Sequence, residues 1–491
     1  MPALQPDRAA LEAALQGGGA ANGQVLTRAQ LRAIYQKRDF EPIWNEQRAE
    51  ALHRALDEAP AQGLDAMDLS VQATNPTARE LSQTDAFLRY AAALARGRVP
   101  PSSFESDWRI ASPGFDPAKV LDAALAGGIG PALADLAPHD PAYERLRSAL
   151  ARYRALARHD WRVLRVTATM RPGASGEAVR ALRERLAAEG FIAPSSGDAD
   201  PAFYDNALAE AVSHFQETHG LAVDGVTGKA TLAALNVSAA ARANQISLNL
   251  ERWRSLPRMT APTRIDVNVA AASAVLYEDG AAIKTMRVIV GSAAHPTPVF
   301  RTRMTSVLLN PPWNVPSSIL RNEIDPKLKR DPNYLARGNY AFIEANGGRR
   351  LVQRPGPKNA LGQLKFEMPN PDDVYMHDTP DRRLFARARR TLSHGCVRVE
   401  DPRDLARRVI DSDAWSDAAL DSAIETGQTQ RVPLRQDIPV YVLYWTAFVD
   451  ADDTVEFRDD VYGRDQRLAE ALAAEAAAGH LAAAATNHGA C

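Results

Sequence analysis

Cysteine is almost absent from this sequence. Its 491 residues include only two, Cys396 within the chain and Cys491 at the last position. Two thiols placed in this way predict no disulfide framework of the kind that holds small secreted domains together. Structural zinc sites normally show paired cysteine or histidine ligands at short spacing, and a second cysteine cluster is missing, so we expect no metal site. The remaining possibilities for Cys396 are a small buried side chain or a reactive nucleophile.

Long apolar runs and an excess of basic charge are also missing. No run of eighteen or more apolar residues occurs, so no transmembrane helix is predicted. The net charge of −2 argues against a nucleic-acid partner bound through its phosphates. Residues 1–16 lack the apolar core of a signal peptide. The protein is therefore expected either to be cytoplasmic or to have lost an export signal that is not part of this sequence.

The sequence contains enough apolar residues for several cores. A hydrophobic fraction of 45% in 491 residues predicts two to four domains. Residues 1–164 are rich in alanine, leucine and arginine, and Leu31, Ile34 and Tyr35 follow the spacing of one helical face. This part predicts a helical domain without identifiable chemistry.

Residues 165–238 predict a compact unit of three short helices. Ser175, Asp205 and Thr227 are placed to cap these helices, and glycines follow the first two. The residues from Val223 to Gly228 predict a turn before the third helix. Taken alone, these signals fit an ordinary helical spacer as well as a binding domain.

The hydrophobic period changes to that of strands in residues 239–465. Ile265, Val267 and Val269 alternate with polar residues, and Asp279 and Gly280 occupy a hairpin position between two such runs. Residues 316–362 predict an insertion with a helical piece and a Pro-Gly-Pro turn. Residues 466–491 are rich in alanine and predict a C-terminal helix or tail.

The chemistry is concentrated in residues 374–400, which contain Cys396 and His377. A thiolate is the nucleophilic form of cysteine, and a nearby imidazole is the usual means of generating it at neutral pH. Gly395, directly before Cys396, lets the main chain approach a substrate and turn its N–H groups inward.

The order His-Asp-Thr-Pro, an arginine-rich spacer and Ser-His-Gly-Cys-Val-Arg-Val resembles the signature of the L,D-transpeptidases, the YkuD-type enzymes of peptidoglycan. The resemblance implies that Cys396 is the nucleophile and His377 the general base. That family often has glycine after this histidine, where the present sequence has Asp378, and the His-Asp-Thr-Pro form resembles its large multidomain branch. Residues 165–238 resemble a peptidoglycan-binding domain, on Phe215-Gln216 and the residues from Val223 to Gly228.

The resemblance implies a multidomain α+β fold: a helical N-terminal scaffold, a three-helix peptidoglycan-binding-like domain and a β-rich catalytic domain whose insertion caps the substrate groove. It implies 3→3 cross-linking, in which a tetrapeptide stem is the donor and a diaminopimelate amine of a second stem the acceptor. It also implies acylation by carbapenems, no cofactor and a periplasmic location, with other cell-wall synthesis proteins as possible partners. A cysteine-dependent cell-wall peptidase and a non-catalytic peptidoglycan-binding scaffold are the alternatives, because the sequence does not reveal the acceptor.

Further site residues are expected around the thiol. Backbone N–H groups at His394, Gly395 and Cys396 are expected to hold the oxyanion, and His394 is expected to shape the turn. Arg398 could bind a substrate carboxylate, or could equally pair with Glu400 or Asp401. The expected substrate-binding residues are Ser393, Arg398, Tyr375, Trp313 and Asn314.

Two of these expectations compete with ordinary structural roles. Trp313 and Tyr375 are expected to line the substrate groove if they are functional, although aromatic side chains usually fill a core. Five arginines between the two halves of the motif could attract an acidic stem peptide, although a solvated loop is the default; they are Arg382, Arg383, Arg387, Arg389 and Arg390.

Overall fold

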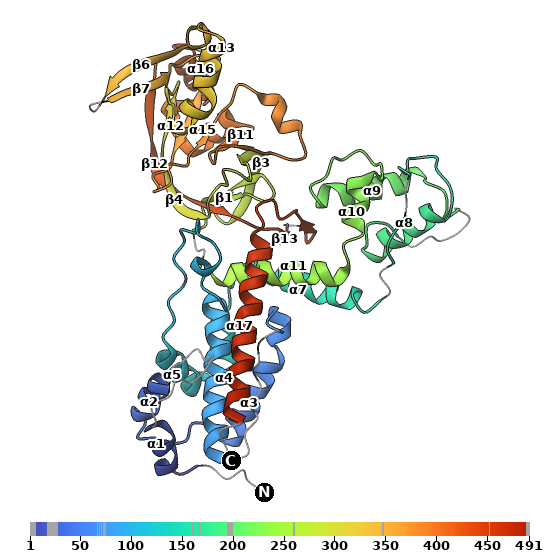
Figure 1. The fold of residues 1–491 in the computed structure, drawn as a ribbon, viewed down its shortest axis with the longest axis vertical. Coiled ribbons are helices and arrows are strands. Elements are labelled where there is room, and N and C mark those ends of the chain that lie inside the picture. Colours follow the sequence, from blue (N-terminus) through green and yellow to red (C-terminus); the bar gives the residue numbers. More distant parts are fainter. Residues whose placement is uncertain are drawn as a thin grey trace. The chain divides into compact units, whose positions relative to one another are not determined.

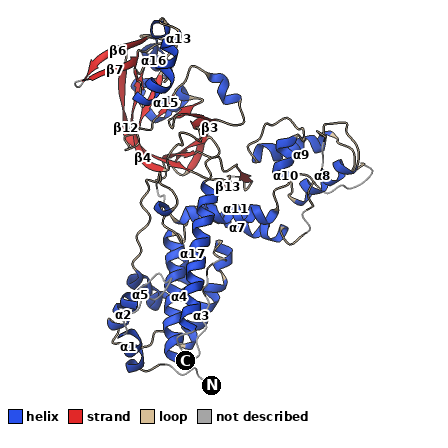
Figure 2. Ribbon diagram, in the orientation of Figure 1, coloured by secondary structure: helices blue, strands red, loops and turns tan. Residues whose placement is uncertain are grey.

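The computed structural model describes residues 6–16, 28–65, 67, 69, 71, 75–159, 162–165, 168–193, 200–258, 261–345, 348–450 and 452–487. The chain forms two compact units. Unit 1 comprises Met1–Ser106, Ile110–Met259 and Thr446–Cys491, and unit 2 comprises Asp107–Arg109 and Thr260–Trp445. Helices dominate unit 1 and strands dominate unit 2 (Figure 2).

Unit 1 is built from helices and one small hairpin (Figure 1). Its elements are α1 (Arg8–Gln16), α2 (Arg28–Gln36), α3 (Glu46–Asp57), η1 (Ala59–Gln62), α4 (Pro76–Arg96), η2 (Pro101–Ser103), α5 (Pro117–Gly127), α6 (Ile129–Ala134), α7 (Pro141–Leu156), α8 (Glu177–Ala188), α9 (Asn206–Thr218), α10 (Lys229–Leu235), α11 (Ala239–Arg254), β13 (Ala447–Val449), β14 (Val455–Phe457) and α17 (Arg464–Asn487). The predicted apolar face of α2 is confirmed, because Leu31, Ile34 and Tyr35 are all buried.

Buried polar contacts fix how the helices of unit 1 join. The Arg254 side chain of α11 is fully buried, and its guanidinium donates to Glu251 at 2.7 Å and to the Gln62 carbonyl oxygen at 2.7 Å. Glu251 also accepts the main-chain N–H groups of Arg98 and Val99, which follow α4. A single buried carboxylate therefore ties α11 to the end of α4.

The three helices expected in residues 165–238 are α8, α9 and α10, packed around one apolar cluster. The cap at Asp205 is confirmed, because its carboxylate accepts the Leu208 N–H at 2.8 Å. The caps expected at Ser175 and Thr227 are wrong. The helices begin one residue later, after Gly176 and Gly228, neither of which has a side chain to accept a hydrogen bond.

Unit 2 contains a nine-stranded sheet in the order β10-β3-β11-β9-β8-β4-β12-β1-β2, and a further pairing of β2 with β3 closes all but β10 into a ring. The strands are β1 (Arg264–Asn268), β2 (Ser273–Glu278), β3 (Ala281–Gly291), β4 (Phe300–Leu309), β8 (Leu364–Glu367), β9 (Met376–His377), β10 (Thr391–Ser393), β11 (Val397–Val399) and β12 (Gln430–Leu443). The predicted hairpin turn is confirmed: Asp279 (φ 48°) and Gly280 (φ 84°) connect β2 to β3.

The insertion has its own secondary structure. A second sheet of three strands has the order β5-β7-β6. The elements of this region are β5 (Trp313–Asn314), α12 (Ser317–Ile319), η3 (Leu320–Ile324), α13 (Asp325–Arg330), α14 (Tyr334–Arg337), β6 (Tyr340–Ala345) and β7 (Gly348–Gln353). After the insertion come η4 (Arg382–Ala386), α15 (Pro402–Ile410), η5 (Asp413–Trp415) and α16 (Asp417–Glu425).

The compact units differ in extent from the segments expected from sequence. Residues 239–259 and 446–465 were expected in the catalytic segment but lie in unit 1. The reason is packing: α11 contacts α7, α4 and α17, and the hairpin of β13 and β14 contacts α7, α11 and α9. The alanine-rich C-terminal stretch is the helix α17, drawn in red in Figure 1.

Replacing Glu251 with alanine is expected to destabilise unit 1 by about 3–5 kcal/mol, because Arg254 would keep a buried and uncompensated charge. The matched control is Glu50→Ala, which removes the carboxylate partner of Arg54 in α3, an ion pair exposed on both sides, and is expected to cost less than about 1 kcal/mol. Urea unfolding followed by far-ultraviolet circular dichroism measures both variants. Equal midpoints for the two would contradict the structural role given to Glu251.

Candidate active site

The loop that precedes Cys396 is held by the hydroxyl group of Ser393. This hydroxyl donates to the Cys396 carbonyl oxygen at 2.6 Å and accepts the Gly395 N–H at 3.1 Å. Ser393 is also buried. Its side chain therefore shapes the loop, which differs from the substrate contact expected of it.

Gly395 is the point at which this loop turns and meets a neighbouring segment. Its φ of +112° lies in a region that favours glycine. The Gly395 carbonyl oxygen accepts the Thr297 hydroxyl at 2.7 Å, and the same hydroxyl accepts the Gly291 N–H at 2.9 Å. The loop is thereby fastened to the end of β3.

The main-chain donors around Cys396 are not equivalent. The Gly395 N–H already donates to Ser393, and the Val397 N–H donates to the Tyr375 carbonyl oxygen at 3.0 Å. Within the described part of the chain, the N–H groups of His394 and Cys396 have no recorded acceptor. An oxyanion site at this loop would therefore use these two donors, and Gly395 would act through its conformation.

The pairing of β11 with β9 brings the two halves of the sequence motif together. The strands are parallel, and Arg398 lies opposite His377. Because side chains alternate along a strand, Cys396 and Tyr375, each two residues earlier, lie on the same face as this pair. The candidate nucleophile, the candidate base, an arginine and a tyrosine thus share one surface of the sheet.

His377 is buried, and a main-chain oxygen fixes its ring. Its Nδ1 lies 2.5 Å from the Asp378 carbonyl oxygen, which assigns the ring proton to Nδ1 in the neutral tautomer, and the main chain of Leu361 also interacts with the ring. Burial lowers the pKa of His377 to about 3, and the positive charge of Arg398 adds to this effect. The imidazole is therefore neutral near pH 7, the form that takes up a proton.

The Asp378 carboxylate supports the main chain around His377. It accepts the Gln363 N–H at 2.9 Å and the Thr379 N–H at 2.7 Å. Gly362, with φ +62°, packs against this carboxylate so closely that a Cβ atom there would overlap it. Asp378 therefore holds the strand end that carries His377, which accounts for an aspartate at this position.

Tyr375 joins three other side chains beside the thiol. The Lys365 ammonium nitrogen is 4.2 Å from the centroid of its ring, and the His377 ring is 5.6 Å away. The Tyr375 hydroxyl interacts with Cys396 and with Trp313, and burial raises its pKa well above the ordinary value. Tyr375 and Trp313 therefore lie at the thiol and are not simply part of a distant core.

The Cys396 thiol is half-buried. Burial raises its pKa, whereas Tyr375 and the positive charges of Lys365 and Arg398 act in the opposite direction. Its sulfur atom lies 4.0 Å from the Asp373 carbonyl oxygen. The resting pair is consequently a neutral thiol with a neutral imidazole, so the proton must leave the sulfur as the reaction begins.

Arg398 lies near the thiol and does not pair with Glu400 or Asp401, the two carboxylates that the sequence offered as partners. Glu400 binds Arg287 at 2.9 Å and Asp401 binds Lys284 at 2.8 Å. Within the described residues, the Arg398 Nε is buried and has no hydrogen-bond partner. Burial lowers the pKa of this guanidinium. These features favour a role in anion binding over a structural ion pair.

His394 connects the loop of Cys396 to the insertion. Its Nε2 lies 2.6 Å from a carboxylate oxygen of Glu323, which belongs to η3. Its ring centroid is 4.6 Å from that of His295. The side chain therefore links this loop to the insertion, and the expectation that His394 shapes the turn stays a prediction.

Lys365 is a residue of this site that sequence reasoning missed. It lies directly opposite His377 in the antiparallel pairing of β8 with β9. The alternation of the apolar residues Leu364 and Phe366 with Lys365 in the sequence predicts a strand whose outer face carries Lys365. The structure agrees, because Leu364 and Phe366 are buried and Lys365 is half-buried. No local pattern could show which strand lies beside it. Asn314, in turn, is exposed in β5 beside Trp313.

The arginine-rich segment is largely engaged with its own domain. Arg390 and Arg382 donate to main-chain carbonyl oxygens, and Arg389 donates to Thr391. Arg383 is 93% exposed and pairs with an aspartate. This segment is therefore mainly a solvated and locally tied loop.

Three sequence expectations concern features outside this cluster. Cys491 lies outside the described residues. Within the described part of the chain, no group of three or more histidine, cysteine, aspartate or glutamate side chains is arranged to hold a metal ion. No helix there combines the length and the apolar character needed to cross a membrane.

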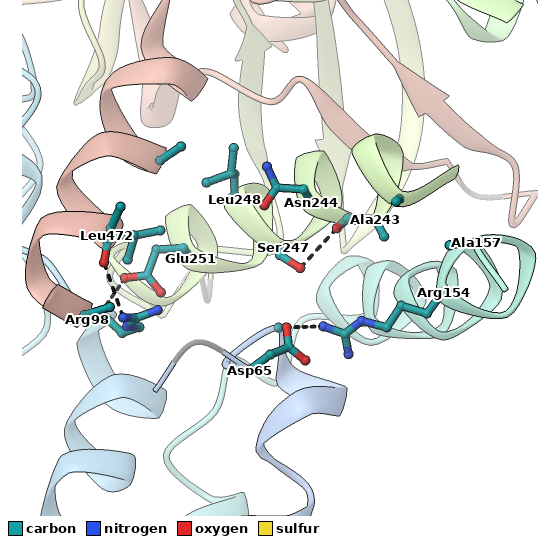
Figure 3. A pocket seen from close by; sticks show the side chains of 15 residues that line it. Asp65, Arg98, Arg154, Ala157, Ala243, Asn244, Ser247, Leu248, Glu251 and Leu472 are labelled. Carbon is teal, nitrogen blue, oxygen red and sulfur yellow. Dashed lines mark hydrogen bonds and ion pairs between the residues drawn. The ribbon is translucent and has the colours of Figure 1, made fainter. Parts of the chain in front are cut away.

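A cavity of about 440 Å³ lies within unit 1, among α11, α17 and the turn that contains Gly63. Figure 3 shows Arg154 directed at Asp65, and Arg98 directed at the carbonyl oxygen of Leu472. Arg98 also pairs with Glu475. These charges are satisfied within the protein, so the cavity is unlike the surface around Cys396.

Family models match three segments of the chain. Residues 262–429 match the L,D-transpeptidase catalytic domain, residues 29–150 match the scaffold domain, and residues 175–235 match the model described as "Putative peptidoglycan binding domain". Together with the helical N-terminal region and the β-rich unit 2, these matches agree with the multidomain α+β fold expected from sequence.

Individual relatives are similar over parts of their length. A "Putative L,D-transpeptidase" from Haemophilus influenzae is 34% identical over 241 residues, 46% of this chain and 48% of its own length. The chain thus spans about half the length of that relative. The amidase CwlL from Bacillus licheniformis is 47% identical over 66 residues, 13% of this chain and 18% of its own.

Solved structures are more distant. An L,D-transpeptidase from Xylanimonas cellulosilytica is 17% identical, with 57% of this chain and 98% of that chain covered, at a TM-score of 0.19. Such a low TM-score adds nothing to the family matches.

The alkylation rate of Cys396 by iodoacetamide is expected to rise steadily from neutral into alkaline solution, because the pKa of this thiol is raised by burial. The pKa of about 3 for His377 means that no imidazolium is present near neutrality to stabilise a thiolate. Intact-mass measurements at a series of pH values give the rate, with Cys396→Ala as the blank. Full reactivity already reached below neutral pH would indicate an ion pair and contradict this description.

Proposed function

Because the chain carries an L,D-transpeptidase catalytic domain beside a scaffold domain and a peptidoglycan-binding domain, we propose that it is a peptidoglycan L,D-transpeptidase that forms 3→3 cross-links through a thioester on Cys396. The observation that carries this proposal is the shared face of β9 and β11. It presents a half-buried thiol on the same face as a neutral imidazole, whose Nδ1 lies against the Asp378 carbonyl oxygen.

In the first half of the reaction, His377 Nε2 takes the proton from the Cys396 sulfur, and the sulfur attacks the carbonyl carbon of the bond between an L- and a D-centre of the stem peptide. The N–H groups of His394 and Cys396 donate to the oxyanion. Each such donor typically contributes on the order of 100- to 1,000-fold in rate. The leaving D-amino acid takes the proton from His377, and a thioester remains on Cys396.

In the second half, an amine attacks the thioester. The acceptor is the diaminopimelate side-chain amine of a second stem, and His377 removes its proton as the new amide bond forms. The sulfur then leaves and recovers a proton from His377. Water in place of the amine would make the same enzyme a peptidase, which is the alternative within the same chemistry.

The surroundings of the thiol support binding of an anionic donor. Arg398 is placed to hold a substrate carboxylate, and Trp313 and Tyr375 form an aromatic wall at the thiol. Asn314 lies exposed beside Trp313 and completes the proposed groove. The insertion reaches the loop of Cys396 through the contact of Glu323 with His394, as a cover over the groove would.

This function places the protein where peptidoglycan is made, in the periplasm, with stem peptides as donor and acceptor and carbapenems as covalent inhibitors. The chemistry needs no cofactor, because the thiol supplies the nucleophile and the imidazole the proton transfers. The peptidoglycan-binding domain would hold the enzyme at its polymer. A non-catalytic scaffold is a weaker proposal, because it gives no reason for a free thiol beside a neutral histidine.

Incubation with a carbapenem is expected to add one drug mass to the protein and none to Cys396→Ala. Cys491→Ala is the matched control, because it removes the other thiol and should keep the adduct. His377→Ala is expected to slow acylation by roughly 100- to 10,000-fold, the usual range for a lost general base. Absence of an adduct in the wild type, with Cys396 also slow towards iodoacetamide, would overturn the proposed mechanism.

Product analysis separates the transferase from the peptidase. With a purified disaccharide tetrapeptide, the wild type is expected to release the terminal D-amino acid and to form a dimer linked between two third residues. Liquid chromatography with tandem mass spectrometry identifies both products. Release of the D-amino acid with only tripeptide monomer would show that water is the acceptor and would favour the peptidase.

A further inference from the structure

Two positive side chains flank the thiol and imidazole on one face of the sheet. Lys365 on β8 and Arg398 on β11 both lie opposite His377, one from each side. Both are half-buried. In the described part of the chain neither has a carboxylate partner within ion-pair distance, and the Lys365 ammonium instead lies over the ring of Tyr375.

The acidic groups nearby are committed elsewhere or act from a distance. Asp381 attracts Arg398 electrostatically but pairs with Arg383. Glu367, two residues after Lys365, accepts from Ser306 and pairs with Arg431. The carboxylate of Asp373 lies on an exposed residue and acts electrostatically on Tyr375.

Unpaired charges in a half-buried position lose hydration without regaining it from the protein, which costs free energy. Such a cost is tolerated where a ligand supplies the opposite charge. Strands β8 and β11 are separated by β9, so the main chains that carry the two cations are roughly 10 Å apart, twice the spacing of neighbouring strands. Two separate anionic groups suit this spacing better than one shared group.

We propose that Lys365 is a specificity-determining residue, which pairs with a second carboxylate of the acyl donor while Arg398 holds the first. This inference rests on the proposed function and adds to it the charge that the donor must carry. The site then selects a donor with two free carboxylates near the bond that is broken. A donor in which one of them is an amide leaves one cation desolvated and unpaired.

A stem tetrapeptide has two sources for these carboxylates. One is the C-terminal carboxylate of the D-amino acid that leaves. The other is the carboxylate on the side chain of a diamino-dicarboxylic third residue, which is absent when that residue is lysine and neutral when it is amidated. Both sources offer the same chemistry, so the experiment has to separate them.

Three donor substrates are assayed with the wild-type enzyme and with the Lys365→Met variant. The first has both carboxylates free, the second has a C-terminal amide, and the third has a side-chain carboxamide. Values of kcat/KM come from release of the terminal residue. Lys365→Arg is the conservative variant that keeps the charge, and Lys119→Met, at an 86% exposed lysine in α5, is the matched charge-removal control.

We expect the wild-type kcat/KM for the donor with both carboxylates free to exceed that for one of the two amide donors by on the order of 10- to 100-fold. This is the range of a charge-assisted hydrogen bond. Lys365→Met should reduce that ratio to less than about threefold for this amide alone, with Lys365→Arg retaining most of it. Lys119→Met should behave as the wild type. The amide concerned identifies the carboxylate that Lys365 reads.

The outcomes that overturn the inference differ from those that overturn the function. No turnover of any donor by the wild type contradicts the proposed function. Turnover of all three donors at similar rates, or a selectivity that persists in Lys365→Met, leaves the function intact and overturns the role of Lys365. A role confined to positioning the ring of Tyr375 would slow Lys365→Met equally with all donors, and this also contradicts the inference.

A substrate-free measurement provides a second readout. Iodoacetate and iodoacetamide alkylate the same sulfur, but only iodoacetate is an anion. The ratio of their rates at Cys396 should fall by several-fold in Lys365→Met relative to the wild type, Lys365→Arg and Lys119→Met. Because both reagents meet the same thiol, a change in its pKa cancels in the ratio. An unchanged ratio would show that the Lys365 charge does not act on anions at this site.

Discussion

The parallel pairing of β9 with β11 is the constraint on which the candidate site depends. It sets Arg398 opposite His377 and therefore places Cys396 and Tyr375 together on the same face. A shift of one residue would turn one set of side chains to the other face, where Met376 and Val397 are fully buried. The apolar residues between the functional ones thus maintain the alignment of the chemistry.

Around this pair of strands, the supporting contacts are mostly to main-chain atoms. Ser393 and Thr297 hold the loop of Cys396, and the Asp378 carboxylate holds the strand end that carries His377. The Asp378 carbonyl oxygen also fixes the histidine tautomer. These contacts orient the reacting side chains before a substrate arrives, which is how a site lowers the cost of ordering during catalysis.

The candidate site combines a neutral nucleophile and base with an excess of positive charge. Burial keeps the Cys396 thiol and the His377 imidazole neutral. The charged groups on this face are instead two cations, Lys365 and Arg398, without carboxylate partners among the described residues. An anionic donor would complete this balance, and binding and reactivity would then be coupled through the same charges.

The sequence by itself determined the candidate pair Cys396 and His377, the multidomain α+β class, the Asp279-Gly280 turn and the helical character of the N-terminal region, because local spacing and motif order carry these signals. It misplaced the caps at Ser175 and Thr227, where glycines begin the helices. Only the tertiary structure decided that Lys365 belongs to the site, that Ser393 serves the loop and that Arg398 lacks its expected partners. Those facts depend on which strands pair and in which register, and residues far apart in sequence determine that pairing through burial of their apolar faces.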